Sequence, residues 1–162
     1  MIMNSDASSK KGAVTGVTKN RNNEKSTDAD GISATGEARG RFMIRAKKNQ
    51  YWADIELDGF WRESGGEFAV KTVRYRSVKN GRREGNIKLG LVSKEDTGWE
   101  ELTGNAIQDG EWHDFEHELS VKGDAKEAII HFNFIYDRKG DPDINMTGAD
   151  TSFYNEWFLS RQ

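Results

Sequence analysis

The chain of 162 residues contains no cysteine. A disulfide framework and a thiolate metal site are therefore both excluded. No apolar run approaches the roughly 20 residues that a membrane-spanning helix needs. The opening residues, Met-Ile-Met-Asn-Ser-Asp, also lack the apolar stretch of a signal peptide. From these absences we expect no membrane span and no export signal.

Aromatic residues are absent from the first 38 positions, although the chain has five Trp, eight Phe and four Tyr. Beyond the initial Met1, the only sizeable aliphatic side chains in this segment are Ile2, Met3, Val14, Val17 and Ile32. Such a polar segment cannot bury enough surface to offset its ordering entropy. We therefore predict a polar N-terminal arm over residues 1–38, extended or disordered unless bound, and a folded domain over residues 39–162.

The formal net charge of −3 is unevenly distributed. Residues 1–50 carry ten Lys or Arg and five Asp or Glu, a net +5, whereas residues 51–162 carry fourteen and twenty-two, a net −8. This asymmetry predicts that a basic arm binds the acidic body of the same or a neighbouring subunit. The alternative is that charge only keeps a flexible arm soluble. The basic residues assigned to the arm are Lys10, Lys11, Lys19, Arg21, Lys25, Arg39 and Arg41.

Alternation of apolar and polar residues predicts strands along the rest of the chain. The expected strands cover residues 41–46, 51–57, 67–78, 86–92, 111–121, 128–136 and 152–160. In residues 67–78 the apolar phase shifts by an odd number, which indicates a bulge or a strand that is apolar on both faces. Lys79-Asn80-Gly81 predicts a hairpin. About eight such strands without an amphipathic helix favour an all-β sandwich or jelly roll.

Three motifs suggest a family. One is the strand Gly66-Glu-Phe-Ala-Val-Lys-Thr-Val-Arg-Tyr-Arg-Ser, one is Gly110-Glu-Trp-His-Asp-Phe-Glu-His-Glu-Leu, and one is the ending Ser152-Phe-Tyr-Asn-Glu-Trp-Phe-Leu. Together they resemble carbohydrate-binding modules of the galactose-binding-like jelly-roll type over residues 66–162. The resemblance implies a two-sheet jelly roll and, through it, a glycan as a ligand.

Sugar recognition requires flat aromatic rings that lie against C–H faces, together with polar groups that bind hydroxyls. Trp52 shares the polar face of its strand with Asp54 and Glu56, and Trp61 falls in an expected turn. The alternative is that each tryptophan belongs to the core. We expect Trp112 and Trp157 to be core residues and leave Trp99 open. The candidate glycan-binding residues are Trp52, Trp61, Arg74, Tyr75, His131 and Asn133.

Residues 137–150 form a segment rich in Asp and Asn, with acidic or amide side chains at alternate positions. Such groups are ligands for hard cations. An EF-hand is excluded because Met146 occupies the glycine position and Ser152 the place of the bidentate Glu. The alternative is an ordinary polar turn. The candidate ligands for a structural calcium ion are Asp141, Asp143, Asn145 and Asp150.

Catalytic patterns are missing from the sequence. It contains neither a nucleophile elbow nor a zinc-binding His-Glu-x-x-His motif. His113 and His117 would lie roughly 13 Å apart on one strand, too far to share a metal. We expect no enzyme, and we interpret three pairs of acidic residues as solvated strand faces. They are Asp54/Glu56, Glu100/Glu101 and Glu116/Glu118. The acidic body also argues against nucleic acid as a partner.

Two functions remain after these exclusions. In the first, the protein is a non-catalytic accessory component of a larger assembly, such as a virion decoration protein or a filament subunit, and its arm attaches it to neighbouring subunits. In the second, it is a free or excised carbohydrate-binding module that recognises a polysaccharide. A particle surface or an extracellular surface would suit either function.

Overall fold

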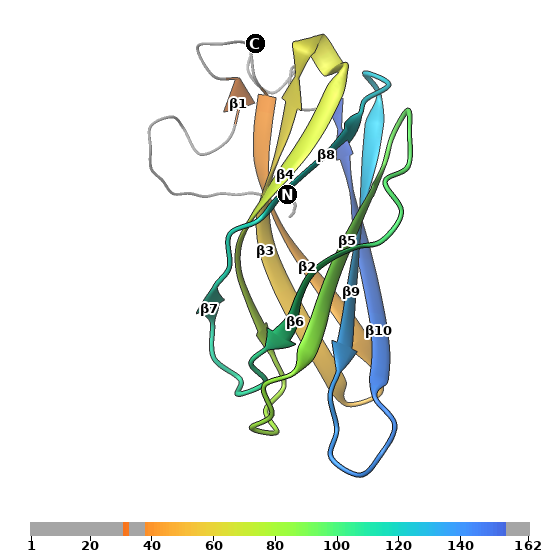
Figure 1. The fold of residues 1–162 in the computed structure, drawn as a ribbon. Coiled ribbons are helices and arrows are strands. Elements are labelled where there is room, and N and C mark those ends of the chain that lie inside the picture. The colour runs from red at the N-terminus through yellow and green to blue at the C-terminus, as the bar shows by residue number, and fades with distance from the viewer. Residues whose placement is uncertain (1–30, 33–37, 155–162) are drawn as a thin grey trace.

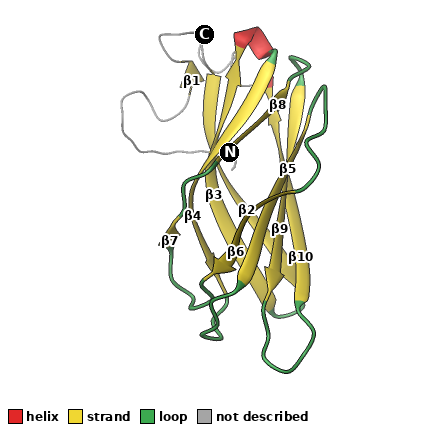
Figure 2. Cartoon of the chain, viewed as in Figure 1, coloured by secondary structure: helices red, strands yellow, loops and turns green. Residues whose placement is uncertain are grey.

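The computed structural model describes residues 31–32 and 38–154. These residues form two antiparallel β-sheets that pack face to face, with one short 3-10 helix (Figures 1 and 2). The all-β class predicted from alternation is confirmed. The elements are β1 (Gly31–Ile32), β2 (Ala38–Lys48), β3 (Tyr51–Arg62), η2 (Glu63–Gly65), β4 (Glu67–Ser77), β5 (Gly85–Val92), β6 (Glu100–Ala106), β7 (His113–Asp114), β8 (Glu118–Lys122), β9 (Glu127–Tyr136) and β10 (Ile144–Phe153).

The two sheets alternate along the chain, as in a jelly roll. The first sheet, sheet A, has the order β1-β2-β3-β4-β7, and β8 also pairs with β4. The second sheet, sheet B, has the order β10-β9-β5-β6. The chain therefore crosses between sheets after β4, after β6 and after β8, which winds it around a shared core.

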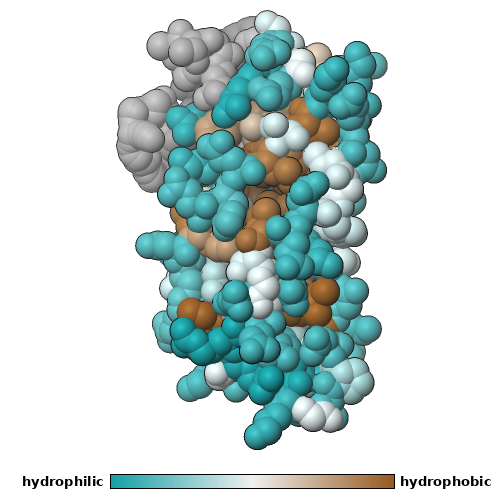
Figure 3. Space-filling model, in the orientation of Figure 1, coloured by the Kyte–Doolittle hydropathy of each residue, from teal (hydrophilic) through white to brown (hydrophobic). Residues whose placement is uncertain are grey.

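The core is formed by the inward side chains of both sheets, and the predicted inward rows of residues 41–46, 51–57, 86–92 and 128–136 are confirmed. Each such Phe, Ile or Leu stabilises the fold by about 1.5–3 kcal/mol. The fully buried large side chains include Phe42, Ile55, Leu57, Phe68, Ile87, Leu89, Leu91, Ile130, Phe132 and Phe134. Figure 3 shows the complementary pattern on one side of the molecule, where hydrophilic side chains surround the apolar residues visible between the sheets.

A bulge in β4 explains the shifted apolar phase of residues 67–78. Glu56 pairs with Arg74 and Leu57 pairs with Thr72, so Val73 has no opposite residue on β3. The register shift lets both halves of β4 face the core, because the inward positions are even-numbered before Val73 and odd-numbered after it. The predicted bulge is confirmed.

The predicted hairpin at residues 79–81 is wrong. β4 and β5 belong to different sheets, so the loop between them changes sheet instead of returning beside β4. The backbone N–H groups of Asn80 and Gly81 both donate to the carbonyl oxygen of Gln108, which holds this loop against the segment after β6. Both strands can then turn their apolar rows toward the one core.

The C-terminal part of the sheet also differs from the prediction. The last described strand is β10, which includes the second half of the Asp- and Asn-rich segment 137–150. Exposed polar residues of β10 alternate with inward-facing residues, of which Met146 and Ser152 are buried. The expected strand 152–160 extends beyond the described residues, which end at position 154, and Trp157 lies outside them. β6 was not predicted, and the expected strand 111–121 is divided into β7 and β8.

The structure changes the assignment of the basic residues. β2 begins at Ala38, so Arg39 and Arg41 belong to sheet A and not to the arm. Lys10, Lys11, Lys19, Arg21 and Lys25 lie outside the described residues. Residues 1–37 contain five Lys or Arg and five Asp or Glu, so this segment has no net formal charge. The excess positive charge of residues 1–50 comes from β2, which corrects the prediction of a basic arm.

Candidate functional site

The outer face of sheet A carries a row of carboxylates on β3 between arginines on β2 and β4. Asp54 accepts hydrogen bonds from Arg45 at 2.7 and 2.9 Å and from Arg76 Nε at 3.0 Å. Register places these three residues directly opposite one another on adjacent strands. Asp54 is therefore buried beneath two guanidinium groups, an arrangement that satisfies a carboxylate in a sheet.

Glu56 repeats this arrangement two residues further along β3. Its carboxylate accepts a hydrogen bond from Arg41 at 2.8 Å and another from Arg74. Burial alone would raise the pKa of Glu56, but the charges and hydrogen bonds of Arg41 and Arg74 outweigh it and hold the pKa below the usual range. Glu56 therefore stays ionised and engaged.

Two tryptophans stack on the same arginines. The guanidinium carbons of Arg45 and Arg76 lie 4.6 and 5.6 Å from the ring centroid of Trp52. The guanidinium carbons of Arg74 and Arg76 lie 4.1 and 4.3 Å from the ring centroid of Trp112. Trp112 therefore lies on this outer face, and the prediction that it is a core residue is wrong. Cations already stack on both rings. Trp52 is therefore only partly exposed, and its ring contributes to this ladder of charged side chains.

Two predicted glycan contacts lie in the core, which corrects their assignment. Trp61 is only 1% exposed. Its Nε1–H donates to Ser152 Oγ at 2.9 Å, and its ring packs against Phe68 at a centroid distance of 4.9 Å. Tyr75 is also buried, and its hydroxyl accepts a hydrogen bond from the backbone N–H of Ile107 at 2.8 Å. Neither ring can reach a saccharide.

His131 and Asn133 point from β9 toward the outer face of sheet B, opposite to the face that carries Trp52 and Arg74. Asn133 is buried, and its Nδ2 donates to Asn145 Oδ1 at 2.6 Å and to Met146 O at 3.0 Å. His131 is partly exposed. The six predicted glycan contacts are thus divided between two opposite faces and the core, and the structure does not bring them together.

Trp99, which the sequence left open, is the most exposed tryptophan of the described residues, at 50%. Its ring meets His131 edge-on, with centroids 6.1 Å apart and an interplanar angle of 72°. Gly90 lies beneath it, where a Cβ atom would come within 2.9 Å of Gly98 O and 3.7 Å of Trp99 Cε3. Gly90 takes an outward-facing position of β5, between the inward-facing Leu89 and Leu91. This glycine is the sequence signal that could have located the surface.

The predicted calcium ligands do not converge. Asp141 and Asp143 are exposed in the loop between β9 and β10, whereas Asn145 and Asp150 belong to β10 itself. The strand separates the latter two by five residues, or roughly 17 Å. Asn145 Oδ1 is already bound to Asn133. Over residues 31–32 and 38–154, no group of three or more acidic or histidine side chains has an arrangement suited to a metal ion.

No family model matches the sequence, and no curated protein matches it. Within the described part of the chain there is also no helix with the length and apolar character needed to cross a bilayer. The functional argument therefore rests on the surfaces of the two sheets.

Proposed function

We propose that this protein is a non-catalytic saccharide-binding module and that Trp99, on the outer face of sheet B, is the ring on which a sugar stacks. The observation that carries the proposal is the half-exposed indole above Gly90, held edge-on against His131. The ring is exposed but has a fixed neighbour, so little orientational freedom remains for a ligand to remove.

Polar residues occupy the next outward-facing row of sheet B, beside the row that contains His131 and Gly90. Lys88 on β5 and Thr147 on β10 both lie opposite Asn133, and Glu101 on β6 lies opposite Lys88. Their outward donors and acceptors flank the row that contains His131 and Gly90. An apolar ring beside hydroxyl-binding groups is the combination that a saccharide requires, and sugar-binding sites combine these two elements.

The state of the carboxylates supports a non-catalytic function. A glycosidase needs an acid with a raised pKa and a second carboxylate across a cleft. The buried carboxylates of sheet A, Asp54 and Glu56, are instead each bound by two arginines, and the pKa of Glu56 is lowered. Such groups hold the sheet together and are not available for proton transfer.

The proposal is tested by affinity gel electrophoresis and calorimetry against a panel of neutral polysaccharides. Trp99→Ala should weaken binding by about 1–3 kcal/mol, by analogy with aromatic stacking of bases, which is about 5- to 150-fold. Trp99→Phe, which keeps a ring, should lose less. Trp52→Ala on the opposite face is the control and should bind normally. Two results would refute the proposal. One is an equal loss of affinity in Trp99→Ala and Trp52→Ala, and the other is that the unaltered protein binds none of the polysaccharides.

The accessory role in a larger assembly stays a prediction. The charge asymmetry gives this role less support than the sequence suggested, because the excess positive charge lies in β2. There Arg41 and Arg45 form hydrogen bonds with carboxylates of β3. A saccharide-binding domain can also serve as the adhesive component of a particle, so this role is compatible with the proposed function.

A further inference from the structure

A second candidate site lies at one end of the sandwich, away from Trp99. The turn between β2 and β3, the loop between β4 and β5 and the loop between β9 and β10 meet at this end (Figure 1). They surround a depression of about 440 Å³, within the range of roughly 300–1,000 Å³ that is typical of small-molecule sites. Its lining includes Tyr51, Val78 and Tyr136.

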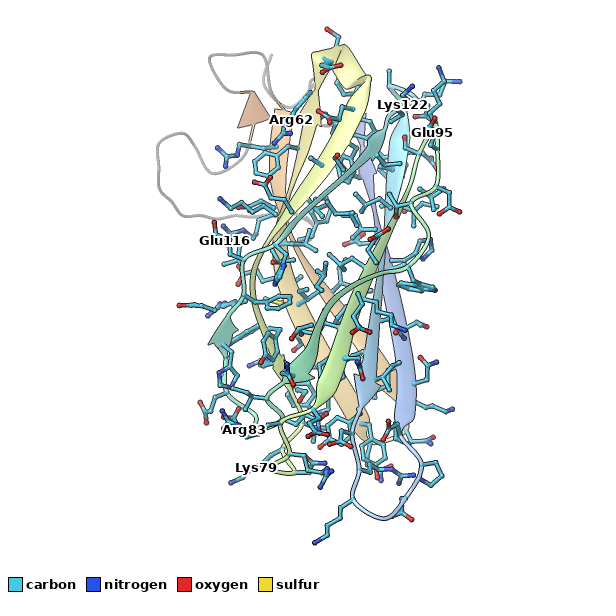
Figure 4. The ribbon with its side chains drawn as sticks, in the orientation of Figure 1. Arg62, Lys79, Arg83, Glu95, Glu116 and Lys122 are labelled. Atoms are coloured by element: carbon cyan, nitrogen blue, oxygen red, sulfur yellow. The ribbon has the colours of Figure 1, made fainter. Side chains whose placement is uncertain are left out.

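All charged side chains that line this depression are cationic: Lys79, Arg82, Arg138 and Lys139. They come from separate loops of a chain whose net charge is negative. Figure 4 shows Lys79 and Arg83 at this end of the molecule, far from Lys122 at the other. Like charges that the fold brings together repel each other unless an anion lies between them. The acidic residues of the same loops, Glu84, Asp137, Asp141 and Asp143, do not line the depression, although Asp137 is paired with Arg82.

The two arginines are held in position by neighbouring groups. Arg82 Nε donates to Asp137 Oδ2 at 2.7 Å. Arg138 Nε donates to Pro142 O at 2.8 Å, and its Nη1 donates to the Tyr51 hydroxyl at 3.3 Å. Among the described contacts, the terminal nitrogens of Arg82 have no partner, and neither have the ammonium groups of Lys79 and Lys139. Fixed guanidinium groups beside mobile ammonium groups suit the recognition of an oxyanion.

The tyrosines add an apolar wall. The ring centroids of Tyr51 and Tyr136 lie 5.3 Å apart, with an interplanar angle of 49°. The Tyr136 hydroxyl donates a hydrogen bond to Val78 O at 2.8 Å, which fixes its position. Tyr51 is the more exposed of the two and faces the depression. The guanidinium carbon of Arg138 lies 5.6 Å from the Tyr51 ring centroid, so a ligand would meet the exposed part of Tyr51 beside this cation. A ligand that satisfies this site therefore needs an apolar surface for Tyr51 and a negative charge for the cations.

We infer that this loop-end depression is a binding site for an acidic saccharide, a sugar ring that bears a carboxylate or a sulfate. The site is independent of the Trp99 surface. His131, which contacts Trp99, and Tyr136 are five residues apart on β9, roughly 16 Å along the strand, and they point to opposite faces of sheet B. Failure of one site therefore leaves the other untouched.

The test uses calorimetry on the full chain with a galacturonic acid tetramer and its methyl-esterified form, in which each carboxylate is replaced by an uncharged methyl ester. The acidic tetramer should bind and the neutral ester should not. Lys79→Ala/Lys139→Ala should weaken binding at least tenfold, because the variant loses two ammonium groups that can form charge-assisted hydrogen bonds with the oxyanion. The matched control is Lys94→Ala/Lys122→Ala, which removes two exposed lysines elsewhere on the molecule.

Four results would overturn the inference. The first is equal binding of the tetramer and its ester, and the second is equal loss in the two double variants, which would indicate diffuse attraction. The third is the absence of binding to the carboxylated tetramer and to a sulfated oligosaccharide of similar length. If Trp99→Ala abolishes binding of the acidic tetramer while the Lys79/Lys139 variant does not, the acid binds at sheet B, which would support the proposed function and reject this site.

Discussion

At the scale of single residues, the partners of a charged side chain determine its contribution to stability. Glu56 is mostly buried, with 11% of its side chain exposed, between Arg41 and Arg74. Glu116 forms one ion pair, with Lys71 at 2.9 Å, but 73% of its side chain is exposed. Removing a partner from a buried pair leaves an uncompensated charge, whereas an exposed pair contributes little.

This contrast predicts that Glu56→Gln lowers the free energy of unfolding by about 1–3 kcal/mol, below the full value for a buried pair because its arginines are partly exposed. Glu116→Gln is the matched control and should change the free energy of unfolding by less than about 1 kcal/mol. Urea denaturation of both variants measures the two values. If Glu56→Gln costs no more than the control, the ion pairs of sheet A have no structural importance.

The same residue predicts a dependence on pH. The pKa of Glu56 in the folded protein lies below its ordinary value of 4.5. Its pairing therefore stabilises the fold fully above about pH 4.5 and is lost as the pH falls through the lower, folded pKa. Thermal unfolding between pH 7 and pH 2 should show a smaller acid-induced loss for Glu56→Gln than for the unaltered chain. Parallel curves would contradict the lowered pKa.

Tryptophans show how much of the candidate site could be predicted from single residues. Alternation correctly placed Trp52 on an outer face, but it could not show that Arg45 and Arg76 stack on its ring. Trp61 was placed in a turn although β3 continues to Arg62, which puts its ring in the core. The exposure of a ring depends on residues distant in sequence, so pattern alone did not find Trp99.

At the scale of strands, periodicity predicted the elements that have large inward side chains. It also predicted the β4 bulge, because the phase of the apolar residues changes within one strand. It failed for β10, whose inward positions include Gly148 and Ser152 and so give no apolar alternation. It failed for the β4–β5 connection as well, because membership of a sheet is decided by contacts between distant segments.

The small inward residue of β10 has a structural reason. A Cβ atom at Gly148 would come within 2.1 Å of Arg45 O, at the place where β10 of sheet B crosses close to β2 of sheet A. The contact is with backbone, which can move only if the two strands separate. A glycine is therefore required where the sandwich closes along this side.

We predict that Gly148→Ala destabilises the protein by about 1–3 kcal/mol, as overpacked sites do. Gly104→Ala is the control, because its Cβ atom would meet only the side-chain atoms Asn86 Nδ2 at 3.3 Å and Glu101 Oε2 at 3.6 Å. Equilibrium unfolding in urea compares the two variants. Should Gly148→Ala be as stable as Gly104→Ala, β10 would not approach β2 as closely as described.

At the scale of the whole molecule, the described residues share one hydrophobic core between the two sheets. Every residue of the core cluster lies between Phe42 and Tyr154. The alternation of strands between sheets makes the fold depend on contacts between distant parts of that region, and topologies of this kind unfold cooperatively as one unit.

Deletion of residues 1–30 should therefore leave the midpoint of thermal unfolding within a few degrees of the full-length value. Circular dichroism measures the midpoint, and light scattering on the same samples measures the size of any assembly. A cooperative transition together with loss of a larger assembly would support the predicted role of the arm. Loss of the cooperative transition would show that the arm contributes to the core and would contradict the division into arm and domain.

The central claim is that a saccharide stacks on Trp99. It is tested most directly by the indole N–H signals of the five tryptophans in two-dimensional NMR spectra, recorded during titration with cello-, xylo- and manno-oligosaccharides. At least one sugar should shift the Trp99 signal, while the signal of Trp61, whose indole N–H donates to Ser152, should stay fixed. Shifts confined to Trp52 and Trp112, or no shift with any of the three sugars, would contradict it.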